Sequence, residues 1–199
     1  MEAIGWAFDH SHTKDSKYSM NHSIFAFTYA LTLFISSLYF STKLLPGHVN
    51  IGYYPSIAIF LTIYLVIMIS TRMLENGKVA LYEISWACNL CMIEVIYGLL
   101  AQDGRLLEAA LITVCVDQIL WYVDIAGYIV KRKFPIGVAK YLIWPETSNL
   151  RRLTSTHHLW FIPLIQYVTG RQVLSYDSLS ISVVNIIMLE IIGRTTSPK

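Results

Sequence analysis

Charge is the scarcest property of this chain. Only 14% of its 199 residues are charged, against roughly 25% in an ordinary soluble domain. Apolar residues make up 55% of the sequence, and the mean hydropathy is +0.51. This apolar, charge-poor composition excludes a disordered chain and a nucleic-acid-binding module. An ordinary cytosolic enzyme is excluded as well, so we expect a membrane protein.

Cysteine is also scarce, and its pattern excludes two kinds of site. The three cysteines, Cys88, Cys91 and Cys115, lie in apolar stretches, and their odd number argues against a disulfide framework. The Cys88-x-x-Cys91 pair has no second pair of this kind to complete a zinc site. The tail residues His10 and His12 are typical of a solvated segment. From the sequence we expect no metal and no other cofactor.

Long apolar runs are the clearest positive feature. Residues 23–42 and 44–71 contain no Asp, Glu, Lys or Arg, and a spanning helix needs about 20 mostly apolar residues. The predicted fold class is an all-α, multi-pass transmembrane bundle. It has about six spans, near residues 23–42, 52–71, 79–101, 106–130, 155–168 and 174–193. The fifth is the shortest and contains Pro163.

The spans form one predicted membrane domain, residues 23–193, between a polar tail of residues 1–22 and a short tail of residues 194–199. The first tail lacks the basic, apolar and small-residue order of a cleaved signal peptide, so the first span is expected to act as an uncleaved anchor. In a eukaryote we expect the chain in the membrane of the endoplasmic reticulum.

The distribution of Lys and Arg predicts the orientation, because basic residues near span ends are retained on the cytoplasmic side. With a cytoplasmic N-terminus, twelve of the fifteen basic residues fall in cytoplasmic segments. Only Lys43, Arg105 and Arg171 lie on the opposite side. Both termini are therefore predicted to be cytoplasmic. The basic loop of residues 131–153 is interpreted as a topological anchor or, alternatively, as a short interfacial helix.

Ionisable residues inside the spans are the best guide to function, because burying them in a membrane is costly and they usually face an interior cavity. The candidates are Glu83, Glu94, Glu108, Asp117, Asp124 and Glu190. Among these, Glu94 and Asp117 lie deepest in their spans. We expect Glu94 and Asp117 to be the catalytic residues.

Aromatic residues recur with these acids at helical spacing. One stripe of the third span combines Trp86, Glu94 and Tyr97, and it also includes Glu83 and Leu90. The fourth span repeats the pattern in a stripe of Asp117, Trp121, Asp124 and Tyr128. If the two stripes face each other, they line a pocket with acids and rings, and Trp86, Tyr97, Trp121 and Asp124 are predicted to contact the substrate.

Such a pocket suits acid catalysis. Desolvation disfavours the charged form of a carboxyl group, so a buried acid can hold a proton near neutral pH and donate it. Aromatic faces stabilise a developing cation. The pattern favours protonation of an alkene or epoxide followed by a carbocation cascade. The alternative is structural: single acids in membrane helices also bridge helices by hydrogen bonds, and aromatic stripes are often packing surfaces.

Several short motifs resemble one family. Cys88-Asn89 and Glu94-Val95-Ile96-Tyr97, followed by Leu106-Leu107-Glu108 and by Asp117 in the next span, resemble the integral-membrane terpene cyclases of fungal meroterpenoid and indole-diterpene pathways. The segment Asn185-Ile186-Ile187-Met188 is similar to a later part of that family. The resemblance implies metal-independent cyclisation of a prenylated, epoxidised substrate. It also implies that Glu94 is the proton donor, with Asn89 and Asp117 in the pocket.

Two other functions stay open at the level of sequence. Cys91 in the third span and His157-His158 at the start of the fifth loosely resemble a membrane-bound acyltransferase, in which a histidine activates a cysteine nucleophile. The chain is alternatively a non-catalytic accessory subunit whose polar residues contact the helices of membrane partner proteins. In every case the expected surroundings are membrane lipids, and no nucleic acid is involved.

Overall fold

The predicted all-α class is confirmed by a computed structural model, which describes residues 20–45, 47–76, 86–170 and 175–196. Within these ranges there is no strand, and Asn50 and Asp103 form an isolated β-bridge. The α-helices are α2 (Met20–Leu44), α3 (Pro55–Asn76), α5 (Ala87–Ala101), α6 (Gly104–Lys131), α7 (Asn149–Thr154), α8 (His157–Thr169) and α9 (Tyr176–Thr196). A 3-10 turn, η3 (Lys140–Ile143), lies in the loop after α6.

Three of these helices are long and apolar enough to cross a membrane: Ile24–Leu44 in α2, Pro55–Glu75 in α3, and α6. Helix α8 has 13 residues with Pro163 inside it, so it rises only about 20 Å and is shorter than a hydrocarbon core of about 30 Å. Part of the predicted third span, residues 79–85, lies outside the described residues. Large apolar side chains such as Phe25, Ile59 and Val116 are exposed on the outer faces of the long helices, as expected for contact with lipid.

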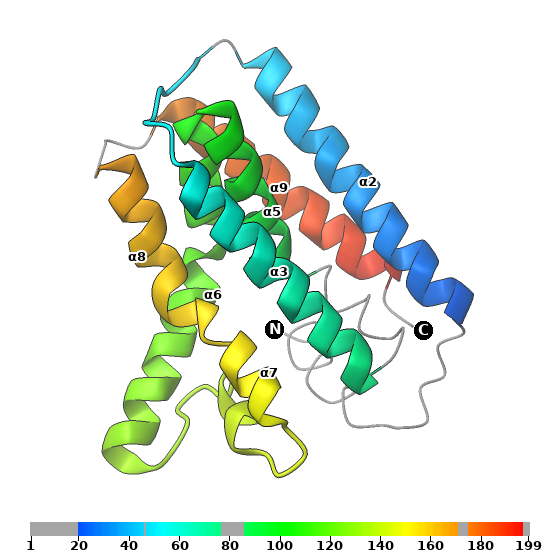
Figure 1. The fold of residues 1–199 in the computed structure, drawn as a ribbon, viewed down its shortest axis with the longest axis vertical. Coiled ribbons are helices and arrows are strands. Elements are labelled where there is room, and N and C mark those ends of the chain that lie inside the picture. The colour runs from blue at the N-terminus through cyan, green and yellow to red at the C-terminus, as the bar shows by residue number, and fades with distance from the viewer. Residues whose placement is uncertain (1–19, 46, 77–85, 171–174, 197–199) are drawn as a thin grey trace.

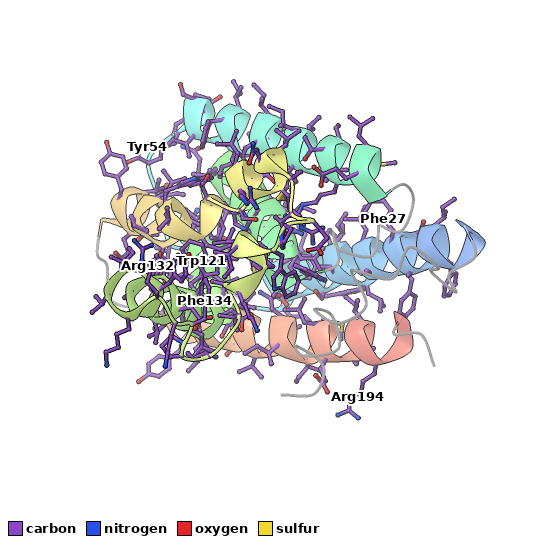
Figure 2. The ribbon with its side chains drawn as sticks, turned by 90° about the horizontal axis from the view of Figure 1, so that it is seen from below. Phe27, Tyr54, Trp121, Arg132, Phe134 and Arg194 are labelled. Carbon is purple, nitrogen blue, oxygen red and sulfur yellow. The ribbon has the colours of Figure 1, made fainter. Side chains whose placement is uncertain are left out.

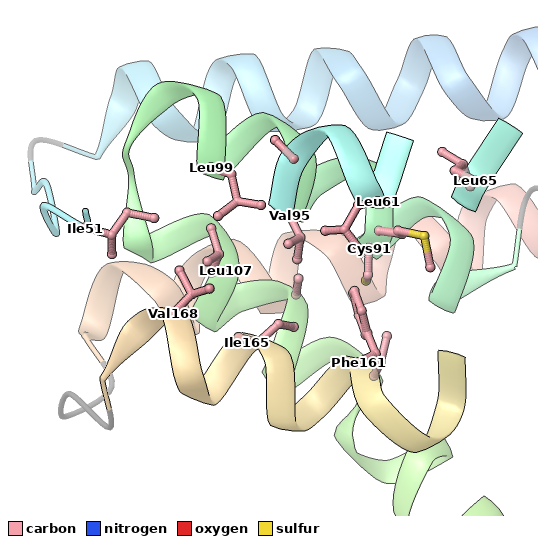
Figure 3. Close-up of a cluster of buried hydrophobic side chains, with 14 of the residues drawn as sticks. Ile51, Leu61, Leu65, Cys91, Val95, Leu99, Leu107, Phe161, Ile165 and Val168 are labelled. Carbon is pink, nitrogen blue, oxygen red and sulfur yellow. The ribbon is translucent and has the colours of Figure 1, made fainter. Parts of the chain in front are cut away.

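Helix α5 lies at the centre of the bundle, packed against α3 and α6, while α2 and α9 pack together on the other side (Figure 1). One apolar cluster joins α3, α5, α6 and α8 through residues such as Leu61, Val95 and Phe161 (Figure 3). A second cluster joins α2, α9, α5 and α6 and includes Phe34 and Ile181. The two faces of α5 therefore contribute to two different cores.

A tight junction connects α5 to α6. Gln102 ends α5 in the left-handed conformation with φ of 56°, and the Asp103 carboxylate accepts the backbone N–H of Arg105 to cap α6. Gly98 permits the close approach, because a Cβ there would lie 2.5 Å from Leu107 Cδ1. Helices α5 and α6 therefore pack closely against each other from this corner.

The connections between helices gather at two ends of the bundle. The backbone N–H of Gly104 donates to the Val49 carbonyl at 2.6 Å, and the Arg105 guanidinium reaches both the Leu45 carbonyl and Asp177 at the start of α9. At the opposite end, the Ser148 hydroxyl before α7 hydrogen-bonds to Glu75 of α3. The α2–α3 and α5–α6 connections and the start of α9 thus lie at one end, and the loop after α6 lies at the other (Figure 1).

Candidate functional site

Glu94 lies in the interior, between α5 and α9, with no exposed surface. Its two carboxylate oxygens accept from the Asn185 side-chain amide of α9 at 3.1 and 2.9 Å. No salt bridge to Glu94 is formed by the part of the chain that the structure describes. The Asn185 amide oxygen is itself buried and has no hydrogen-bond partner. The Glu94 carboxyl group and the neutral Asn185 amide therefore face each other, and the Asn185 oxygen is an unused hydrogen-bond acceptor.

The other predicted residues of α5 do not surround Glu94. Asn89 is buried one turn earlier, where its amide oxygen accepts from the Cys88 thiol at 3.6 Å. Trp86 is half-buried at the start of the helix, and Tyr97 is 44% exposed on an outer face. Glu83 lies outside the described residues. The predicted stripe of acids and rings on this helix is therefore not a single pocket wall.

The residues of the predicted stripe on α6 also lie in different environments. Asp117 is exposed, whereas the next residue, Gln118, is completely buried. The centre of the buried face of α6 runs through Gln118 and Trp121, so Asp117 lies at the edge of that face and not opposite Glu94. The expectation that two facing stripes place Asp117 and Glu94 in one pocket does not match this arrangement.

Asp124 has a structural role at the end of the same stripe. It is fully buried, and its carboxylate oxygens accept backbone N–H groups of Ile136, Gly137 and Ala139 at 2.8 to 2.9 Å. These bonds hold the start of the loop after α6 against the helix. The Asp124 carboxylate is therefore engaged by backbone donors in this arrangement, in contrast to the predicted substrate-binding role.

The remaining intramembrane candidates contact nearby polar groups. Glu108 is buried and accepts from the Ser178 hydroxyl at 2.6 Å and the Ser175 N–H at 3.2 Å, which ties α6 to the start of α9. Glu190 is exposed and pairs with Arg194 at 2.6 Å. Figure 2 shows Arg194 directed away from the bundle. Glu94 and Glu108 are thus both buried against neutral partners, whereas Glu190 is exposed and ion-paired; Glu94 differs from Glu108 in that a side-chain amide contacts both of its carboxylate oxygens.

A second polar cluster, formed by Cys88, His157 and His158, was not anticipated as a unit. One ligand atom from each of these side chains lies within 4.8 Å of the other two. Trp121 stacks on His158 with ring centroids 5.4 Å apart, and the two histidine rings are 4.1 Å apart. Trp121 lies among the side chains in the interior of the bundle in Figure 2. Trp121 was predicted to contact a substrate, and in the structure it is buried and stacks on a histidine.

The cysteine beside the histidines is not the one that the acyltransferase hypothesis used. Cys91 is completely buried in the apolar cluster of α3, α5, α6 and α8, one turn along α5 from Cys88. Both Cys88 and the His157-His158 pair are visible in the sequence, but α5 and α8 are about 70 residues apart. Only their packing reveals the contact. The side-chain amide of Gln118 lies 2.9 Å from His158 Nδ1, and no sequence pattern indicated Gln118 as a site residue.

Two titratable groups in the loops have shifted pKa values. Burial acts to raise the pKa of Asp103, but hydrogen bonds from Arg105 and its positive charge outweigh burial, so the pKa lies below its usual value. Burial raises the pKa of Tyr141 in η3, although hydrogen bonds with Ser155 and Trp121 act in the opposite direction. At neutral pH, Asp103 is therefore an anion and Tyr141 a neutral phenol.

No protein-family model, curated protein or solved structure matches the chain.

Proposed function

We propose that the chain is an integral-membrane enzyme in which Glu94 donates a proton to a prenylated, lipid-like substrate and so starts its cyclisation. The observation that carries this proposal is the complete burial of Glu94 against a neutral partner, Asn185. Burying an unpaired carboxylate costs far more than burying a neutral carboxylic acid. The protonated form is the one that this site holds at least cost, and it is the form that an acid catalyst needs.

The Asn185 amide is suited to both states of the acid. With its NH2 group toward Glu94 it donates to the carboxylate, as in the structure. Its oxygen has no other hydrogen-bond partner, so a turned amide accepts the hydrogen of a protonated Glu94. The pair therefore exchanges one hydrogen bond for another when the proton leaves. Asn185 belongs to the segment that resembles the cyclase family, and metal-independent protonation fits the same resemblance.

The membrane arrangement that we propose has six spans with both termini in the cytoplasm. Arg105, which is predicted to lie opposite the cytoplasm, contacts the Leu45 carbonyl after α2 and Asp177 at the start of α9. The meeting of these segments at one end of the bundle supports alternating helix directions. Because Glu94 has no exposed surface, a substrate reaches it only when α9 separates from α5. A lipid-like substrate would make that approach from the bilayer.

The test is expression in a host that is supplied with a prenylated aromatic epoxide, with product analysis by mass spectrometry. The wild-type chain should form a cyclised isomer of the same mass. The Glu94→Gln variant should lose about 100-fold or more of this activity, because proton transfer by a positioned side chain contributes roughly that much. Protein levels are compared in the same membranes.

Glu190→Gln is the matched control, since Glu190 is an exposed glutamate paired with Arg194. It should cyclise the substrate like the wild type. Unchanged turnover by Glu94→Gln would eliminate the acid role. Absence of any turnover, together with purification in a fixed complex with another membrane protein, would instead favour the accessory-subunit hypothesis.

A further inference from the structure

The cluster of Cys88, His157 and His158 lies apart from Glu94 and has no part in the proposed proton donation. Its three ligand atoms lie within 4.8 Å of one another. They come from the first turns of α5 and α8, and α6 closes the cluster through Gln118 and Trp121. Three side chains of the types that coordinate transition metals therefore converge from two helices that are distant in sequence.

The donor set selects a class of metal ion. One thiolate and two imidazoles suit Zn²⁺ and similar borderline-soft cations, whereas Mg²⁺ and Ca²⁺ require oxygen ligands. In a tetrahedral zinc site with bonds of about 2.0–2.3 Å, neighbouring ligand atoms are about 3.3–3.8 Å apart. The observed spacing of up to 4.8 Å exceeds that value by roughly 1–1.5 Å, so metal binding requires the three side chains to move closer together.

His157 is oriented as a metal ligand. Its Nδ1 atom is 2.8 Å from the Thr154 carbonyl, which only accepts hydrogen bonds, so Nδ1 carries the hydrogen. The lone pair then lies on Nε2, which is buried and has no hydrogen-bond partner. His157 as a whole is 2% exposed. A ligating histidine commonly donates its other N–H to a backbone carbonyl, and a buried, unused Nε2 calls for a ligand.

Gln118 can fix the tautomer of His158 in the same way, so that one ring nitrogen is available to a metal. Its side-chain amide is 2.9 Å from His158 Nδ1, and its other polar atom, Oε1, is buried without a partner. When the amide is turned, the oxygen accepts the Nδ1 hydrogen and the lone pair of His158 lies on Nε2. Trp121, stacked on the ring at 5.4 Å, limits its rotation.

One positive and one negative side chain lie near the cluster, so the Cys88 thiolate supplies most of the negative charge for a bound cation. Arg72 of α3 is close enough for its positive charge to act on all three ligands. The Asp117 carboxyl also acts on Cys88, with a negative charge. These two charges oppose each other. A bound cation is then neutralised mainly by the Cys88 thiolate, whose proton is released when the metal binds.

From these contacts we infer that Cys88, His157 and His158 bind a zinc-like divalent cation between α5 and α8. Three protein ligands leave the fourth tetrahedral position open, as in catalytic zinc sites where a water or a substrate completes the coordination. This site is independent of Glu94, so its test does not depend on the cyclase proposal.

The test uses the full chain, purified in detergent without a polyhistidine tag and loaded with Zn²⁺. Elemental analysis after desalting should find about one zinc per chain. The Cys88→Ser and His157→Gln variants should bind Zn²⁺ at least about tenfold more weakly, and Gln118→Leu should weaken binding by roughly 10- to 100-fold. Zinc retained at wild-type affinity by both ligand variants, or no zinc in the wild type, would overturn the proposal.

Two matched controls exclude other sources of metal. Cys91→Ser removes the neighbouring buried cysteine and should keep the zinc, as should His10→Gln/His12→Gln. If a ligand variant fails to fold, Co²⁺ gives a second readout in a Cys91→Ser/Cys115→Ser chain, where Cys88 is the sole thiol. This chain should show a thiolate-to-cobalt charge-transfer band, and its absence would refute coordination by Cys88.

Discussion

Asp117 and Asp124 lie seven residues apart on α6 but occupy different environments. Asp124 is fully buried and accepts backbone N–H groups of the following loop, whereas Asp117 is exposed. Both have the same chemistry and nearly the same helical phase. The difference arises because the loop folds back over Asp124, whose carboxylate accepts three of its backbone N–H groups. Periodicity alone therefore cannot separate a structural acid from an available one.

Replacing Asp124 should destabilise the fold. In Asp124→Asn only one side-chain oxygen remains to accept, so the backbone N–H groups of Ile136, Gly137 and Ala139 compete for it. We expect a loss of about 2 kcal/mol in the free energy of unfolding, because an unsatisfied buried donor costs roughly 1–3 kcal/mol. Denaturant titration of the detergent-solubilised chain measures this change.

Asp117→Asn is the matched control on the same helix, and its effect should stay within about 0.5 kcal/mol, as for most exposed sites. An equal or larger loss in Asp117→Asn would contradict the structural role assigned to Asp124.

At the scale of elements, the α5–α6 junction depends on one buried ion pair. Arg105 is 3% exposed and binds Asp103 at 2.7 Å, and it also reaches Asp177 at 3.4 Å. Because the pKa of Asp103 is lowered in the folded chain, its unfolded form takes up a proton first as the pH falls. Its contribution to stability is therefore complete above the ordinary aspartate pKa of about 3.9, and it is lost as the pH falls toward the folded-state pKa.

We expect Asp103→Asn to cost about 2–3 kcal/mol at pH 7, in the range of a hydrogen bond to a charged group. The difference from the wild type should be the same at pH 5 and should shrink below about pH 4. Unfolding titrations at several pH values give this difference directly. Asp177→Asn, which removes the longer and more exposed contact, should cost about 1 kcal/mol or less. A pH-independent difference for Asp103→Asn would contradict the ion-pair account.

Most helices could be predicted from the sequence, but their partners could not. Runs without charge locate α2 and α3, and an apolar run with three acids locates α6, to within a few residues, because apolar length is a local property. The contacts of Glu94 with Asn185, and of Cys88 with His157, join segments that are far apart in the chain. Such contacts depend on helix rotation and tilt, which a hydrophobic run does not specify.

At the scale of the whole molecule, the order of the connections leads to a topological prediction. The segments around Val49, Arg105 and Asp177 meet at one end, and the Glu75–Ser148 contact lies at the other. Successive helices therefore alternate in direction if each one crosses the membrane. Twelve of fifteen basic residues fall on the side predicted to be cytoplasmic, which agrees with an even number of spans.

We therefore expect reporters fused to either terminus to lie on the same, cytoplasmic side of the membrane. Protease added to sealed vesicles with the cytoplasmic face outward should remove both reporters, because neither is shielded by the bilayer. A reporter inserted after Gly47, in the α2–α3 connection, is the internal control and should be protected until detergent opens the vesicles. Protection of one terminal reporter and not the other would show an odd number of spans, and would place α8, with its 13 residues, as a segment that enters the membrane without crossing it.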